Sequence, residues 1–214
     1  MRQEPIVSVG GTVIDDDGEL DPIQVSEVAS GRRCGDCTLC CKLLPVVGLK
    51  KLAGMRCVHQ RAGKGCTIYE RRPHECQWWN CRWLAGDGTE GVGRPDRVHY
   101  VVDMIPDYVH QLLPNGERTD IPVLQIWVDP NFRDAWKTPA CLAYIERMAA
   151  ERRMAAIIRF GSGEAITVFA PPWAEDGQWH FPDTKVLPEG EAGLKSMRKS
   201  RRPSGPPADG KLTL

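Results

Sequence analysis

Residues 34–41 read Cys34-Gly35-Asp36-Cys37-Thr38-Leu39-Cys40-Cys41 and place four thiols within eight positions. Cysteines three apart turn back toward one centre, which is why such pairs form the knuckles that bind zinc. Three of them in succession also reproduce the run that holds one iron–sulfur cubane, whose fourth ligand comes from elsewhere. Because Cys40 and Cys41 are adjacent, we expect one of them to serve a second site or to lie beside the first.

Four more cysteines follow singly at longer spacing and are candidates for the distant ligands: Cys57, Cys66, Cys76 and Cys81. Eight thiols match two four-cysteine zinc sites, or one four-cysteine cluster with another site. The spacing favours an iron–sulfur cluster, with Cys66 or Cys76 as the fourth ligand, because zinc sites usually combine two separated knuckles. Zinc is the alternative cofactor. Imidazoles also suit zinc and iron, so further candidates are His59, His74 and His99.

Packing and disulfides are the competing explanations for these cysteines. Small buried cysteines occur in ordinary cores, but eight between Cys34 and Cys81 are more than packing requires. The ninth, Cys141, falls on the apolar side of a predicted helix, and we expect a core residue. The odd total, and the lack of an apolar export segment in residues 1–10, favour a reducing cytoplasmic compartment without disulfides. No apolar stretch approaches the length needed to span a membrane.

Charge is distributed unevenly along the chain. Lys plus Arg and Asp plus Glu both total 28, but residues 32–84 carry eleven basic and three acidic side chains. A basic segment offsets the negative charge of metal-bound thiolates. It also suggests a protein partner for this module or for the basic tail. A nucleic-acid partner is disfavoured because aromatic residues within the basic segment are confined to a few positions such as Trp78, Trp79 and Trp83.

The same residues carry a resemblance to a known family. The Cys34–Cys41 run is followed by Gly65-Cys66-Thr67-Ile68-Tyr69 and by Arg72-Pro73-His74-Glu75-Cys76. Over residues 34–83 this succession resembles the YkgJ-type CxxCxxCC proteins, a family described as zinc- or iron-chelating. The resemblance implies metal ligation by Cys34, Cys37, Cys40, Cys41, Cys66 and Cys76, and by extension Cys57 and Cys81. The chain departs from the family at Gln77-Trp78-Trp79-Asn80-Cys81, where relatives often have an Arg-x-Phe-Pro-Cys-like stretch.

Two further motif residues are expected to bind the cofactor region, namely Tyr69 and Arg72. The fork of donors on Arg72 suits thiolate sulfurs, carboxylates or carbonyls around a metal. Pro73 fixes its own φ and extends the backbone of Arg72, which presents Cys76 after a turn.

Two classes of function follow from the motif. The first is a non-catalytic protein whose metal or cluster is structural, sensory or used in electron transfer. The second is a cluster-dependent enzyme that modifies a protein, because flagellin lysine N-methylase is similar in its cysteine motif. The sequence lacks G-x-G-x-x-G, H-E-x-x-H and an evident nucleophile–base pair, which favours the first class. We assign no catalytic residue.

The predicted fold is α+β, with a cysteine-rich module of short helices and loops beside a small, mainly antiparallel sheet and one helix. Four regions are expected: a β-like segment at 1–30, the cysteine module at 31–90, a sheet region at 95–184 and a flexible basic tail at 188–214. Strands are predicted at 6–9, 12–14, 98–105, 108–113 (the partner of the preceding strand), 123–128, 156–160 and 165–170. Turns are predicted at Pro106-Asp107, at Asn115-Gly116 and around Gly161. Thr138 and Pro139 mark the start of the helix.

Overall fold

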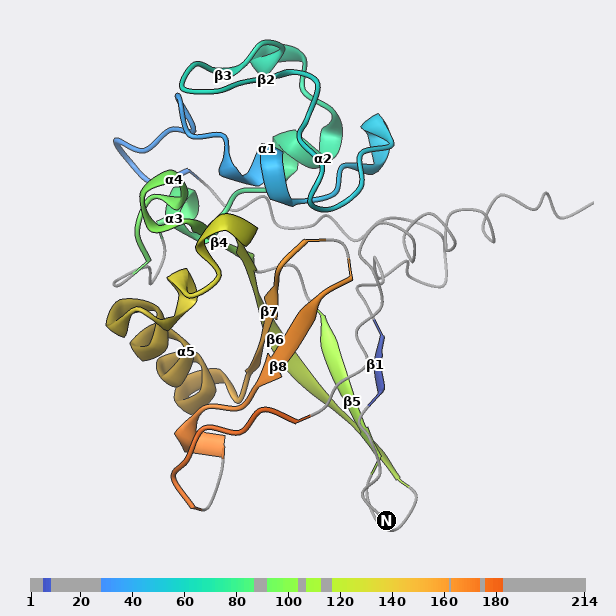
Figure 1. Ribbon diagram of the computed structural model, residues 1–214, viewed down its shortest axis with the longest axis vertical. Coiled ribbons are helices and arrows are strands. Elements are labelled where there is room, and N and C mark those ends of the chain that lie inside the picture. The colour runs from blue at the N-terminus through green and yellow to red at the C-terminus, as the bar shows by residue number, and fades with distance from the viewer. Residues whose placement is uncertain are drawn as a thin grey trace, which may run out of the picture.

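The computed structural model describes residues 6–8, 28–86, 92–103, 107–112, 117–161, 163–173 and 176–182. Its main feature is a six-stranded mixed sheet in the order β1-β5-β6-β7-β8, with β4 also beside β6 (Figure 1). The strands are β1 Ile6–Ser8, β4 Tyr100–Asp103, β5 Tyr108–Leu112, β6 Arg118–Val128, β7 Ala155–Arg159 and β8 Ala165–Val168. The β6–β7 pair is parallel and the other pairs of this sheet are antiparallel. The expected α+β fold is confirmed.

The longest strand, β6, organises the sheet. β5 pairs with its first half, from Leu112 opposite Arg118 to Tyr108 opposite Pro122. β4 pairs with its second half, ending with Tyr100 opposite Val128. The expectation that residues 98–105 pair with residues 108–113 is therefore wrong. An eleven-residue strand presents more backbone donors and acceptors on one edge than either short strand can satisfy, so both lie along it in succession.

The helix α5, Pro139–Arg152, connects β6 to β7 and covers one face of the sheet (Figure 1). It begins at the expected residue and buries Cys141, Tyr144 and Ile145 in the main apolar cluster. Cys141 is 1% exposed, so its predicted place in the core is confirmed. A helical crossover is what joins two parallel strands, and the sequence did not reveal this parallel pair either. The glycine hairpin between β7 and β8 was expected and is present.

The described part of the cysteine module, residues 31–86, lies over one end of the sheet (Figure 1). Its helices are α1 Leu39–Leu43, α2 His74–Trp78 and α3 Arg82–Ala85, and its two-stranded hairpin joins β2 Gln60–Arg61 to β3 Gly65–Cys66. Short 3₁₀ helices are found at Val47–Leu49, Tyr69–Arg71, Pro130–Phe132, Ala135–Lys137 and Pro171–Trp173. A further short helix, α4 Pro95–Val98, occupies the start of the predicted 98–105 strand.

The module joins the sheet through one small apolar cluster. Leu43 and Leu84 pack with Val101 of β4 and Trp127 of β6, and all four side chains are at most 2% exposed. Burial of this kind stabilises by roughly 25 cal/mol per Å² of apolar surface. The cluster therefore sets the position of α1, and with it the positions of the cysteines on α1.

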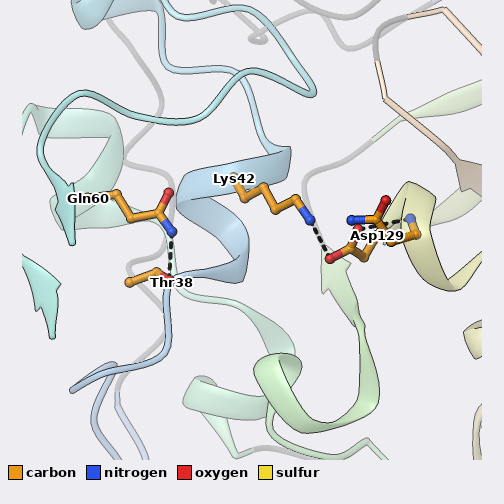
Figure 2. Close-up of polar contacts among 5 residues, drawn as sticks. Thr38, Lys42, Gln60 and Asp129 are labelled. Carbon is orange, nitrogen blue, oxygen red and sulfur yellow. Dashed lines mark hydrogen bonds and ion pairs between the residues drawn. The ribbon is translucent and has the colours of Figure 1, made fainter. Parts of the chain in front are cut away.

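Two polar contacts fasten α1 on opposite sides (Figure 2). Lys42 forms an ion pair with Asp129, just after β6, at 2.5 Å between Nζ and Oδ2. On the other side, the amide of Gln60 donates to the hydroxyl of Thr38 at 2.8 Å. α1 is thus held between the sheet and the β2–β3 hairpin.

Several expectations lie outside the described residues: the strand at 12–14, most of the Asn115-Gly116 turn region and the basic tail at 188–214. Among the helices that the structure describes, none is both long and apolar enough to cross a membrane.

Candidate metal centre

The first knuckle of the cysteine run closes as its spacing predicts. The amide of Cys37 donates to the carbonyl oxygen of Cys34 at 2.9 Å, and Gly35 between them has a left-handed φ of 54°. Burial raises the pKa of the Cys37 thiol, while backbone hydrogen bonds from Leu39 and Asp96 lower it. Amide donors aimed at sulfur favour the thiolate, which is the form that binds metal.

Four thiols form what we call the first cysteine set: Cys34, Cys37, Cys40 and Cys81. Cys81 precedes α3, far along the chain from the others, yet its pKa responds to their charges. Burial raises the pKa of Cys81 to about 12, and the charges of Cys34 and Cys37 raise it further. The pKa of Cys40 lies well above its usual value because of its hydrogen bond with Cys41, burial, and the charges of Cys41, Cys34 and Cys81. The fold thus brings Cys81 within electrostatic reach of Cys34, Cys37 and Cys40.

Three thiols form the second cysteine set: Cys41, Cys57 and Cys76. The amide of Cys57 donates to the carbonyl oxygen of Cys41 at 2.9 Å, which ties this loop to α1. Burial raises the pKa of Cys76 to about 11, with contributions from the charges of Cys41, Glu75 and Cys57. The two sets meet at Cys41, which shares a hydrogen bond with Cys40 and whose charge also acts on Cys34.

A buried cation accompanies the second set. Lys51 is 7% exposed, and its ammonium group donates to the carbonyl oxygen of Leu44. Burial lowers the pKa of Lys51, and the charges of Cys57, Cys41, Cys40 and Cys76 raise it again. A positive charge in this position offsets thiolate charge. The sequence did not single out Lys51, because its neighbour Lys50 is chemically identical and only the burial distinguishes them.

Tyr69 and Arg72 lie beside the cysteines. The guanidinium of Arg72 stacks 3.8 Å from the centre of the Tyr69 ring, and its Nε donates to the Tyr69 carbonyl oxygen at 2.9 Å. Burial raises the pKa of Cys34. The charge of Arg72 and a hydrogen bond from Tyr69 lower it in part. The pKa of Cys41 falls to about 7, mainly because of its hydrogen bond with Cys40. Burial raises this pKa, and the charges of Lys51 and Arg72 lower it.

Cys66 reaches the module on the β2–β3 hairpin, where it is half-buried opposite Gln60. The residue before it, Gly65, has a φ of +85° and lies so close to Gly35 that a Cβ would overlap the Gly35 carbonyl oxygen. Only glycine fits such an approach. The hairpin is therefore packed directly on the knuckle between Cys34 and Cys37.

All nine cysteines are free thiols. Within the described segments, no three His, Cys, Asp or Glu side chains form a group that could hold a metal ion. Of the candidate imidazoles, His99 stacks on Phe132 with ring centres 3.6 Å apart, outside the cysteine module. His59 and His74 are in the module, half-buried and exposed respectively.

Comparisons with protein-family models, with curated proteins and with solved structures found no match to this chain. The relation to the YkgJ-type proteins stays a prediction that rests on the motif residues.

Proposed function

We propose that the chain binds an iron–sulfur cluster or a zinc ion through its cysteine module, in a structural, sensory or electron-transfer role, and that it is a member of the YkgJ-type family. One observation carries the proposal. The four thiols of the first cysteine set come from a turn, from α1 and from the residue before α3, and three of them, Cys34, Cys40 and Cys81, pack in one side-chain cluster. Soft thiolates are the ligands that zinc and iron–sulfur clusters share.

In this proposal the four thiols of the first cysteine set, which do not yet form a ligand group in the described part of the structure, are drawn together on binding. Cys81 then takes the role that the spacing suggested for Cys66 or Cys76. Of the remaining thiols, Cys41, Cys57 and Cys76 suit a second site, whereas Cys66 lies on the hairpin that packs on the Cys34–Cys37 knuckle. The chemistry around the thiols fits the proposal: Arg72 and Lys51 bring positive charge, and amides near Cys37 and Cys81 donate toward sulfur. Such outer donors are usual around bound metals.

Bound metal would supply rigidity or a one-electron redox couple. The surrounding residues would offset the negative charge of the thiolate ligands and limit the access of water. Ligation draws thiols together as it releases their protons, so metal binding is coupled to the folding of the module.

Anaerobic purification from iron-replete cells tests the proposal, with a visible spectrum and analysis of iron, sulfide and zinc per chain. The expected result is a brown protein with broad visible absorbance that a reductant bleaches. A colourless protein with stoichiometric zinc and no iron identifies the zinc alternative. A chain with neither metal, and with no uptake of either on reconstitution, would contradict the proposal.

A further inference from the structure

A pocket of about 550 Å³ lies between the start of the cysteine module and α4. It adjoins the first cysteine set, since Arg33 precedes Cys34 and the charge of Cys37 acts on Arg94. The residues that line the pocket include Gly31, Arg33, Trp83, Gly93, Arg94 and Arg97. Its volume falls within the range of small-molecule sites, about 300–1,000 Å³. Three guanidinium groups around one opening are unusual, because like charges repel unless something lies between them.

The three arginines differ in what they contact. Arg94 binds Asp36 and lies 3.0 Å from Asp96, so its charge is largely compensated. Arg33 and Arg97 are exposed, and no ion pair with a carboxylate is found for either among the described residues. Arg97 still acts on Asp36, whose pKa its charge helps to lower. Among the described residues, the pocket therefore sets three guanidinium groups against two carboxylates, Asp36 and Asp96, and its net charge is positive.

Neighbouring side chains pack against two lining residues of the pocket, Trp83 and Gly93. The ring of Trp83 has the guanidinium of Arg32 5.5 Å from its centre and that of Arg94 at 6.0 Å. Gly93 packs so closely on Val98 of α4 that a Cβ would overlap the valine side chain. Arg94 and Arg97 are three residues apart, and the amide of Arg97 donates to the carbonyl oxygen of Arg94 at 2.9 Å. These contacts restrict the backbone that carries Arg94 and Arg97.

We propose that this pocket binds a small oxyanion, a molecule with phosphate or carboxylate groups, between Arg33 and Arg97. Guanidinium groups present parallel donors that match both kinds of oxyanion. Trp83 offers an apolar wall for the rest of the molecule, and Gly31 leaves open space beside its backbone, since a Cβ there would meet nothing within 4 Å. The site uses none of the proposed metal ligands, so it goes beyond the proposed metal function and does not depend on it.

Titration calorimetry on the full chain as purified, at low ionic strength, tests the proposal with pyrophosphate and with citrate. Binding of one of them or of both is expected, and the preferred probe tells phosphate from carboxylate recognition. Arg33→Ala and Arg97→Ala should each weaken binding on the order of tenfold, because each removes a charge-assisted hydrogen bond. Added salt should weaken it too.

Arg56→Ala is the matched control, since Arg56 is an exposed arginine of the same module outside the pocket. It changes the net charge equally and should leave the Kd unchanged. Metal content measured on every variant separates this site from the metal centre. No binding of either probe, or equal weakening by Arg56→Ala, would overturn the proposal. Tighter binding of a short single-stranded oligonucleotide than of both probes would also overturn it.

Discussion

Replacing Gly65 by alanine tests how the hairpin and the Cys34–Cys37 knuckle depend on each other. Gly65 has a φ of +85°, and an added Cβ would overlap the carbonyl oxygen of Gly35. A left-handed conformation costs an alanine about 1–2 kcal/mol. Moving two backbones apart in a packed site costs roughly 1–3 kcal/mol more. We expect Gly65→Ala to lower the free energy of unfolding by roughly 3 kcal/mol in total.

Gly63→Ala is the control in the same hairpin. Gly63 has a φ of +66°, but a Cβ there would meet nothing within 4 Å. It should therefore show only the conformational cost, about 1–2 kcal/mol. Urea unfolding gives both free energies, and metal analysis of the same preparations shows whether the displaced knuckle still binds. Metal content should fall in Gly65→Ala and be retained in Gly63→Ala. Equal stability and equal metal content in the two variants would refute the reasoning.

Three further predictions address the cysteines. Metal content should fall in Cys81→Ser, because a neutral hydroxyl replaces a soft thiolate, and should be retained in Cys141→Ser. Equal loss of metal in both variants would remove Cys81 from the ligand set. A chelator should expose residues 31–86 to protease while the sheet strands stay protected from hydrogen exchange; full protease resistance of the metal-free module would contradict its dependence on ligands. Burial raises the pKa of Cys141 to about 12, so its folded form keeps a proton that the unfolded thiol loses above about pH 8.5. The stability it contributes is complete below that pH and falls as the pH rises toward 12, by at most about 1.4 kcal/mol per pH unit. In urea titrations, the free energy of unfolding should fall less between pH 8 and pH 10.5 for Cys141→Ala than for the parent protein. An identical pH dependence in the two proteins would show that this thiol does not titrate on unfolding.

Local signals predicted those parts of the fold that local chemistry controls. Thr138 and Pro139 mark the first residue of α5 because proline is tolerated only where its missing amide hydrogen is not needed. The glycines around Gly161 predict the turn between β7 and β8, since few other residues adopt a positive φ. The spacing of Cys34 and Cys37 predicts the knuckle that their backbone hydrogen bond closes.

What no local pattern contains is the choice of partners across the chain. β4 and β5 share one edge of β6, and β7 lies parallel on the other edge, because those pairings depend on the length of β6 and on the apolar face of α5. The same holds at the candidate site. By itself the sequence predicted a metal site from the type and spacing of the eight cysteines, and the family resemblance added Tyr69 and Arg72. Only the tertiary structure put Cys81 with Cys34 and Lys51 beside Cys41, because those neighbours are set by the packing of Leu43 and Leu84 on Val101 and Trp127.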